Sequence, residues 1–248
     1  LLYYLFGSTT LAGMAHVAAP QWFWEGDAVA VETAFTPSGR GRIPNFGLVF
    51  RTNLLEGRTF NYHKQYLRSY KHNIPDHYVF GYYMVSYLRK KTNDPEIWGK
   101  ISARSWSVPF IPFAFSNALH KKTGLYVTDL YRDMAADLKN EWQQEIDKTP
   151  LTVFENVNQR KSKAYTDYLY PQALPDGGVI AMKRGIGNIE QFVLLKNGRE
   201  DKQFTPGFVN DAGMLSAEGS KIVWSEYGYD PRWGVRNYSL IKVYDISV

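Results

Sequence analysis

The sequence contains no cysteine, which excludes disulfide bonds and any metal site built from thiolates. It also lacks an apolar run near the roughly 20 residues that a membrane-spanning helix needs, and it shows no signal-peptide pattern. The chain begins at Leu1 without an initiator methionine, and its opening LLYYLFGSTTLAGMAHVAAP is typical of the middle of a folded domain. We therefore expect the chain to be a fragment of a longer protein.

The sequence also lacks a concentration of charge of one sign. The net charge is +5, but lysine and arginine occur in ones and twos, as at Lys90–Lys91 and Lys121–Lys122. Proteins that bind nucleic acid usually present a continuous basic patch or stripe. We therefore expect no nucleic-acid partner. A hydrophobic fraction of 44% is instead typical of an ordinary globular chain.

The first 150 residues follow a helical pattern. Apolar spacing of three and four predicts helices over 20–37, 76–93, 94–104 and 128–149, with a loop around GRGR at 39–42 and Pro44. Asp76 and Thr128 are the expected N-caps, and Gly124 is the expected stop of a helix in the aromatic segment before it. Residues 1–150 are therefore predicted to be mainly α-helical.

Residues 151–248 follow a period of two. Strands are predicted at 165–170, 178–183, 191–195, 221–226 and 239–246, between clusters of turn residues that include GIGN at 185–188. Two segments repeat one pattern, with Gly177 and Gly219 lying 42 positions apart, which is within the range of a four-stranded propeller blade. The predicted fold class is α+β, with a helical region followed by about two antiparallel blades of an incomplete β-propeller.

One stretch carries a carboxylate that needs an explanation. PQWFWEGDAVAVETAF, at 20–35, places Glu25 directly after three aromatic residues. An ionised carboxylate in apolar surroundings is costly to bury without a partner, so Glu25 should be solvated, paired with a cation or bound to a metal. Glu32 follows seven positions later on nearly the same helix face. There it could orient a partner of Glu25, or lie with Glu25 on the same solvent-exposed surface.

The string WFWEGDAVAVET resembles the third-ligand helix of gluzincin metallopeptidases. It is similar in particular to the peptidase-MA-like domains of bacterial envelope proteins that are fused to TolB-like, WD40-like propellers. VWSEYGYDPRWGVRNYSLIKVYDI, at 223–246, resembles a blade of that type, and DHYVFGYYMVSYLRKK, at 76–91, resembles the helix that follows the metal site. The resemblance implies that Glu25 is a metal ligand and that Tyr78 donates a hydrogen bond to the oxyanion.

The resemblance also implies a chemistry and a location. Two imidazoles and one carboxylate would hold zinc, whose bound water would attack a peptide carbonyl with the help of a separate glutamate. Asp27 or Glu32 would support the ligating carboxylate by hydrogen bonds. A peptide or protein substrate, other envelope proteins as partners, and a periplasmic or outer-membrane-associated location are implied as well.

The sequence departs from that family at the zinc motif. None of the five histidines, which are His16, His63, His72, His77 and His120, begins an H-E-x-x-H sequence. The two imidazole ligands and the general base are therefore expected upstream of Leu1, if the protein is an enzyme. The alternative is a non-catalytic envelope protein that uses a degenerate peptidase domain and a propeller as a binding scaffold.

Other residues have a functional and a structural interpretation. Arg40 and Arg42 could bind a substrate carboxylate or phosphate, because arginine makes bidentate contacts and glycine permits close approach. The favoured interpretation is structural, with both arginines exposed in a turn or paired with Glu32 or Asp27. His16 precedes the Glu25 helix and is interpreted as a loop histidine, and His72 and His77 as surface or supporting histidines.

Overall fold

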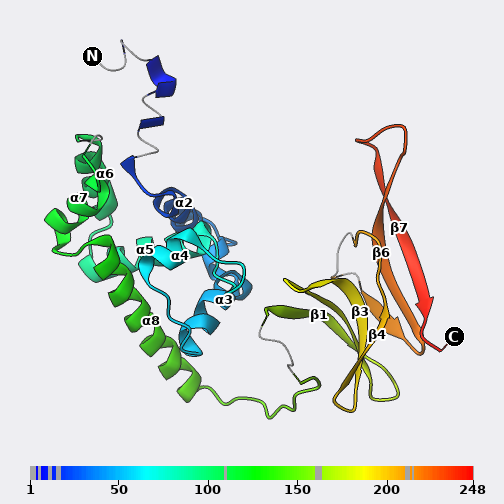
Figure 1. Cartoon of the computed structure of the whole chain (residues 1–248). Helices are drawn as coiled ribbons and strands as arrows, with labels where there is room; N and C mark the ends of the chain where they lie inside the picture. Colours follow the sequence, from blue (N-terminus) through cyan, green and yellow to red (C-terminus); the bar gives the residue numbers. More distant parts are fainter. Residues whose placement is uncertain are drawn as a thin grey trace. The chain divides into compact units, whose positions relative to one another are not determined.

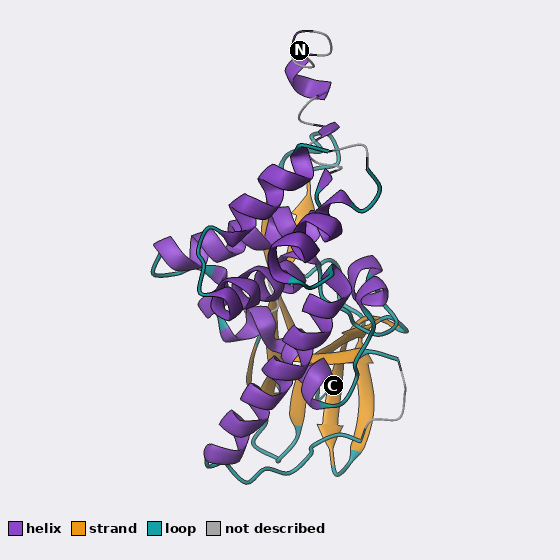
Figure 2. Ribbon diagram, turned by 90° about the vertical axis from the view of Figure 1, so that its left-hand side faces the viewer, coloured by secondary structure: helices purple, strands orange, loops and turns teal. Residues whose placement is uncertain are grey.

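The structure is a computed structural model that describes residues 4, 7–10, 13–14, 18–108, 111–159, 164–209, 213 and 215–247. Contacts divide the chain into two units, Leu1–Leu151 and Thr152–Val248. The first unit is helical and the second is built from antiparallel strands, so the fold class is α+β (Figures 1 and 2). His16 lies outside the described residues.

The helical unit contains more helices than the apolar pattern predicts. Its elements are α2 (Gln21–Phe35), the 3-10 helix η1 (Arg40–Arg42), α3 (Pro44–Leu55), α4 (Tyr62–Leu67), α5 (His77–Thr92), α6 (Ile97–Trp106), α7 (Ala114–Thr123) and α8 (Val127–Lys148). The segment from residue 44 was interpreted as part of a loop, and this was wrong. Pro44 occupies the first helical turn of α3, and Phe50 and Leu54 are buried on its inner face.

The ends of the helices follow local capping rules. Asp76 caps α5, its carboxylate accepting hydrogen bonds from the backbone N–H groups of Tyr78 at 3.1 Å and Val79 at 3.2 Å. Gly124 ends α7 with a φ of 76°, as its position predicts. Thr128 was predicted to cap α8 and does not. The helix begins one residue earlier, at Val127, and Asp129 accepts a hydrogen bond at 3.2 Å from the N–H of Tyr126, the residue before the helix.

The core of the helical unit is built around aromatic side chains. Trp22 of α2 is fully buried and packs against Phe80, Trp98 and Phe115, with ring centroids 5.8–5.9 Å away. The indole nitrogen of Trp22 donates a hydrogen bond of 2.9 Å to the hydroxyl of Tyr62. This packing fixes α2, and with it the residues that face away from the core.

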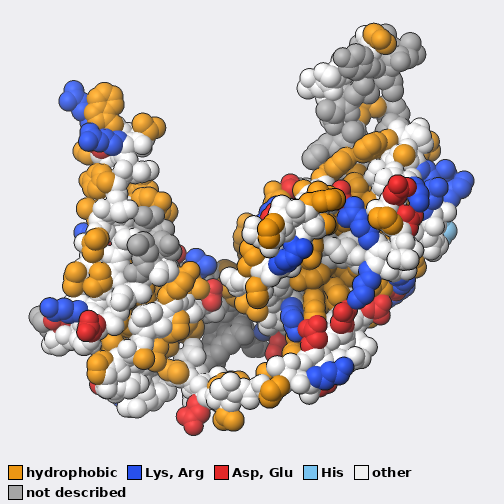
Figure 3. Space-filling model, turned by 180° about the vertical axis from the view of Figure 1, so that it is seen from behind, with side chains coloured by type: hydrophobic (Ala, Val, Ile, Leu, Met, Phe, Trp, Pro, Cys, Tyr) orange, Lys and Arg blue, Asp and Glu red, His pale blue; other side chains and the backbone are white. Residues whose placement is uncertain are grey.

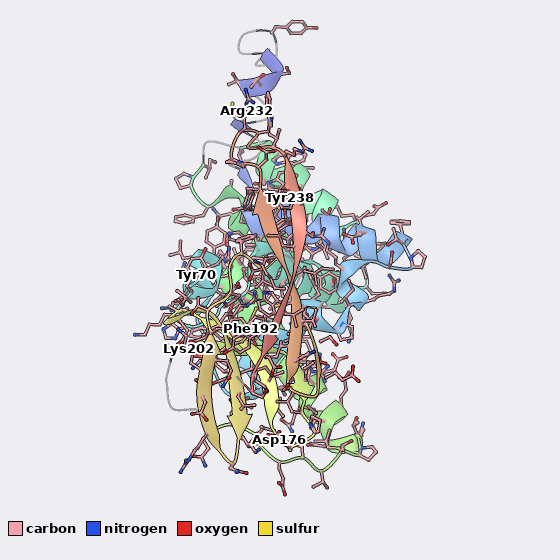
Figure 4. All side chains as sticks on the ribbon, turned by 90° about the vertical axis from the view of Figure 1, so that its right-hand side faces the viewer. Tyr70, Asp176, Phe192, Lys202, Arg232 and Tyr238 are labelled. Atoms are coloured by element: carbon pink, nitrogen blue, oxygen red, sulfur yellow. The ribbon has the colours of Figure 1, made fainter. Side chains whose placement is uncertain are left out.

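The second unit contains two antiparallel sheets. The first has the order β1 (Thr166–Ala173), β2 (Val179–Gly185), β3 (Asn188–Lys196) and β4 (Arg199–Phe204), and the second has the order β5 (Ser216–Glu218), β6 (Lys221–Tyr229) and β7 (Asn237–Asp245). GIGN lies at the turn between β2 and β3, as predicted. Figure 4 labels Phe192 of β3 and Asp176 of the turn between β1 and β2.

The core of this unit joins side chains from both sheets. Phe192 packs against Trp224 of β6, with ring centroids 5.2 Å apart, and Phe204 of β4 packs against the same indole at 4.9 Å. The strand β4 was not predicted, and it pairs antiparallel with β3 as the last strand of the first sheet. Asn197 and Gly198, with φ values of 53° and 70°, form the tight turn that brings β4 back along β3.

The described strands form no closed propeller, because the sheets have four and three strands and neither closes on itself. None of the described helices combines the length and the apolar character that crossing a bilayer would require.

Candidate functional site

The candidate site lies where α2 and α5 approach most closely. Gly26 of α2 faces Gly81 of α5, and a Cβ atom added to Gly81 would lie 2.8 Å from the Cα of Gly26. The backbones therefore touch without intervening side chains. Glu25 precedes Gly26 in the chain, and Tyr78 lies almost one turn before Gly81. The contact of the two glycines thus brings the start of α5 to Glu25.

Glu25 and Tyr78 interact through their polar ends. Hydrogen bonding to the Glu25 carboxylate, together with its negative charge, raises the pKa of the Tyr78 phenol above its ordinary value. Tyr78 is 36% exposed, and Glu25 is half-buried. At neutral pH the phenol therefore keeps its proton and can donate it in a hydrogen bond.

Arg40 extends this pair into a charged network. Its guanidinium lies over the Tyr78 ring, 5.1 Å from the centroid, in a cation–π contact. Glu32 holds Arg40 twice, accepting hydrogen bonds from Nε at 2.8 Å and from the backbone N–H at 3.1 Å. The hydrogen bond from the Arg40 side chain is the main reason that the pKa of Glu32 lies below its ordinary value. Glu32 therefore positions the arginine above the tyrosine.

His77 belongs to the same neighbourhood. Burial lowers its pKa, the charge of Arg68 lowers it further, and the charges of Asp76 and Glu25 act in the opposite direction. Its Nδ1 is buried and has no hydrogen-bond partner among the described residues. Its ring packs against Tyr66, with centroids 5.4 Å apart. The His77 imidazole is therefore neutral and has one nitrogen without a hydrogen-bond partner. It lies close enough to Glu25 for the carboxylate charge to affect its pKa.

The remaining predicted site residues are engaged elsewhere. Asp27 forms an ion pair of 2.6 Å with Arg89. Arg42 donates hydrogen bonds to the carbonyl oxygens of Thr33 and Thr36, the second at 2.8 Å, and so closes the end of α2. The structure thus brings Glu25, Tyr78, Arg40 and Glu32 together and places Asp27 and Arg42 in other contacts. The sequence predicted only a surface or supporting role for His77, although the cap at Asp76 signals that His77 and Tyr78 share the first turn of α5.

The described residues supply only some of the ligands that a zinc site needs. Carboxylate oxygen and neutral imidazole nitrogen are ordinary zinc ligands, and Glu25 and His77 supply one of each. Over the described part of the chain, however, no group of three histidine, aspartate or glutamate side chains is arranged to hold an ion. A zinc ion at Glu25 would therefore need at least one further ligand from outside the described residues.

Comparisons of the chain with protein-family models, with curated proteins and with solved structures gave no significant match.

Proposed function

We propose that the chain is part of a zinc-dependent, peptidase-like protein of the bacterial envelope, with Glu25 as a carboxylate ligand and the second unit as blades of a β-propeller that recruits substrate. The interaction between Glu25 and Tyr78 carries this proposal. A peptidase of this kind needs a half-buried carboxylate beside a hydroxyl that stays protonated, and these two residues supply both.

Zinc bound at Glu25 would polarise a peptide carbonyl and lower the pKa of a coordinated water. The residues of this chain would act around it. The Tyr78 hydroxyl lies beside the Glu25 carboxylate and would donate a hydrogen bond to the substrate oxygen as negative charge develops there. A phenol with a raised pKa suits this task, since it remains protonated through the neutral range.

Arg40 and Arg42 are the proposed contacts for a substrate carboxylate. Arg40 is held over Tyr78 by Glu32, so its positive charge lies next to the group that would receive the developing negative charge. Arg42 is exposed at the same short helix, η1. In this proposal Glu32 supports the site through Arg40, and Asp27 supports it through the ion pair with Arg89 that fixes α2 against α5.

The test is the zinc content of the full-length protein, purified without chelator, as wild type and as Glu25→Gln. The matched control is Glu96→Gln, which removes the same charge from a side chain that is 81% exposed. The proposal expects about one zinc per chain in the wild type and the control, and loss of zinc in Glu25→Gln. Hydrolysis of a fluorogenic peptide library should follow the zinc content. Absence of zinc from all three proteins would support the non-catalytic scaffold instead.

A further inference from the structure

A second candidate site lies on the helical unit, in a cleft between α5 and α8. The cleft has a volume of about 470 Å³, within the range of pockets that hold small ligands. Four aromatic residues line it: Tyr82, Tyr83 and Tyr87 from α5, and Trp142 from α8. Glu25, Tyr78 and Arg40 do not line it, so it is distinct from the candidate zinc site.

The charged groups at this cleft are already paired. Lys90 donates to both carboxylate oxygens of Glu141 at 3.2 Å, and Lys91 lies 2.8 Å from Asp133. The carboxylate of Asp137 accepts a hydrogen bond of 2.5 Å from the Tyr87 hydroxyl. On the face drawn in Figure 3, acidic and basic side chains of the helical unit are likewise intermixed. The two ammonium groups at the cleft are therefore each paired with a carboxylate, and neither is free to select an anionic ligand.

The cleft also has polar groups that are not used. Within the described part of the chain, the hydroxyls of Tyr82, Tyr83 and Ser86 make no hydrogen bond to another residue. The Tyr83 hydroxyl packs closely on Gly47 of α3, so Ser86 supplies the hydroxyl that a ligand in the cleft can reach. Phe50 stacks on the Tyr83 ring with centroids 5.1 Å apart, and Trp142 meets the same ring at 5.4 Å, so the aromatic lining is held rigidly.

We propose that this cleft binds an uncharged carbohydrate. Sugar rings present apolar C–H faces that pack against aromatic rings, and their hydroxyls both donate and accept hydrogen bonds. One hydroxyl can therefore accept from the Lys90 ammonium while it donates to the Glu141 carboxylate. A second can reach the hydroxyl of Ser86, which lines the cleft. An anionic ligand would instead have to break an ion pair to find a free ammonium group.

The experiment is ligand-observed NMR, by saturation transfer, on the protein with four neutral probes. These are trisaccharides of glucose, mannose, galactose and N-acetylglucosamine, and a trisaccharide of galacturonic acid serves as the anionic comparison. We expect saturable binding of at least one neutral probe. Glu141→Gln should weaken it about tenfold or more, because hydrogen bonds to charged groups are the stronger ones. Asp147→Asn removes the same charge from the exposed end of α8 and should leave binding unchanged.

A second variant tests whether the probe binds in the cleft rather than elsewhere on the protein surface. Ser86→Ala removes the serine hydroxyl from the cleft and should weaken binding a few-fold. Circular dichroism establishes that each variant is folded. The proposal is overturned if no neutral probe binds at millimolar concentration, if the galacturonic acid probe binds more tightly than the neutral ones, or if Glu141→Gln binds as the wild type does. None of these outcomes bears on zinc at Glu25.

Discussion

Gly26 and Gly81 touch through their backbones, so α2 and α5 meet with no side chain between them. A Cβ atom on either residue would overlap main-chain atoms of the other helix, including the carbonyl group of Trp22. Backbone atoms cannot move aside as the end of a flexible side chain can. This contact determines how near Glu25 comes to Tyr78, so the geometry of the candidate site depends on two glycines.

The first prediction is that Gly81→Ala destabilises the helical unit by about 1–3 kcal/mol, the usual cost of overpacking a core. The added methyl group has to push α2 away from α5. Urea unfolding followed by circular dichroism measures the change in the free energy of unfolding.

Gly99→Ala in α6 is the matched control. No atom lies within 4 Å of a Cβ added there, and the residue is exposed within the helix. Alanine should therefore stabilise by about 0.5–1 kcal/mol through its helix propensity. A Gly81→Ala variant that is as stable as Gly99→Ala would show that the two helices can separate without cost.

The ends of several elements could be predicted because their signals are local. Asp76 caps α5 through backbone groups two and three residues away, and Gly124 needs only its own positive φ. The helix α3 was missed because its formation depends on the burial of Phe50 and Leu54 in a core that the local sequence does not specify. Tertiary packing here outweighs the loop signals of GRGR and Pro44.

The candidate site was predictable only in part. Glu25 is conspicuous in the sequence, because a charge directly follows three aromatic residues. Tyr78 was singled out only through a family resemblance, and the pairing of Arg40 with Glu32 was one alternative among several. His77 was predicted only as a surface or supporting histidine. The proximity of the site residues depends on the contact between two glycines in different helices. No local sequence pattern indicates such a contact.

A second prediction concerns the ionisation of Tyr78. The Glu25 carboxylate raises the pKa of this phenol and the Arg40 guanidinium opposes it. Glu25→Gln should therefore lower the pKa of Tyr78 toward 10, and Arg40→Gln should raise it further. Titration of ¹³C-labelled tyrosine by NMR measures both shifts. Asp27→Asn is the control, because Asp27 pairs with Arg89 instead. Equal Tyr78 pKa values in wild type and Glu25→Gln would refute the interaction.

A third prediction concerns Glu32 at acid pH. Its pKa lies below the ordinary 4.5 because Arg40 binds its carboxylate in the folded state. The depressed pKa means that this stabilisation is complete above pH 4.5 and is lost as the pH falls through the folded-state value. Arg40→Gln should bring the Glu32 pKa up toward 4.5, as seen by carboxyl NMR titration. The same substitution should also remove the contribution of Glu32 to the change in the free energy of unfolding at acid pH. An unchanged Glu32 pKa would contradict the pairing.

A fourth prediction follows from the buried hydrogen bond between Trp22 and Tyr62. Tyr62→Phe leaves the indole N–H of the fully buried Trp22 without its acceptor, at a cost of about 1–3 kcal/mol for an unsatisfied buried donor. Denaturant unfolding near neutral pH measures this loss. Tyr70→Phe is the control, since Tyr70 is 83% exposed, and should change the free energy of unfolding by less than about 0.5 kcal/mol. Equal stability of the two variants would mean that Trp22 finds another partner.

The last prediction concerns alkaline pH. Burial raises the pKa of Tyr62 to about 12 from an ordinary value of 10, so the folded state opposes loss of the phenolic proton. The stabilisation linked to this proton is fully present below pH 10 and is lost as the pH rises from 10 through about 12, because only the unfolded chain ionises readily there. The free energy of unfolding should therefore fall across this range. The fall should be shallower in Tyr62→Phe, which lacks the titrating group, and parallel slopes in the two proteins would show that Tyr62 ionises as easily in the folded state as in the unfolded one.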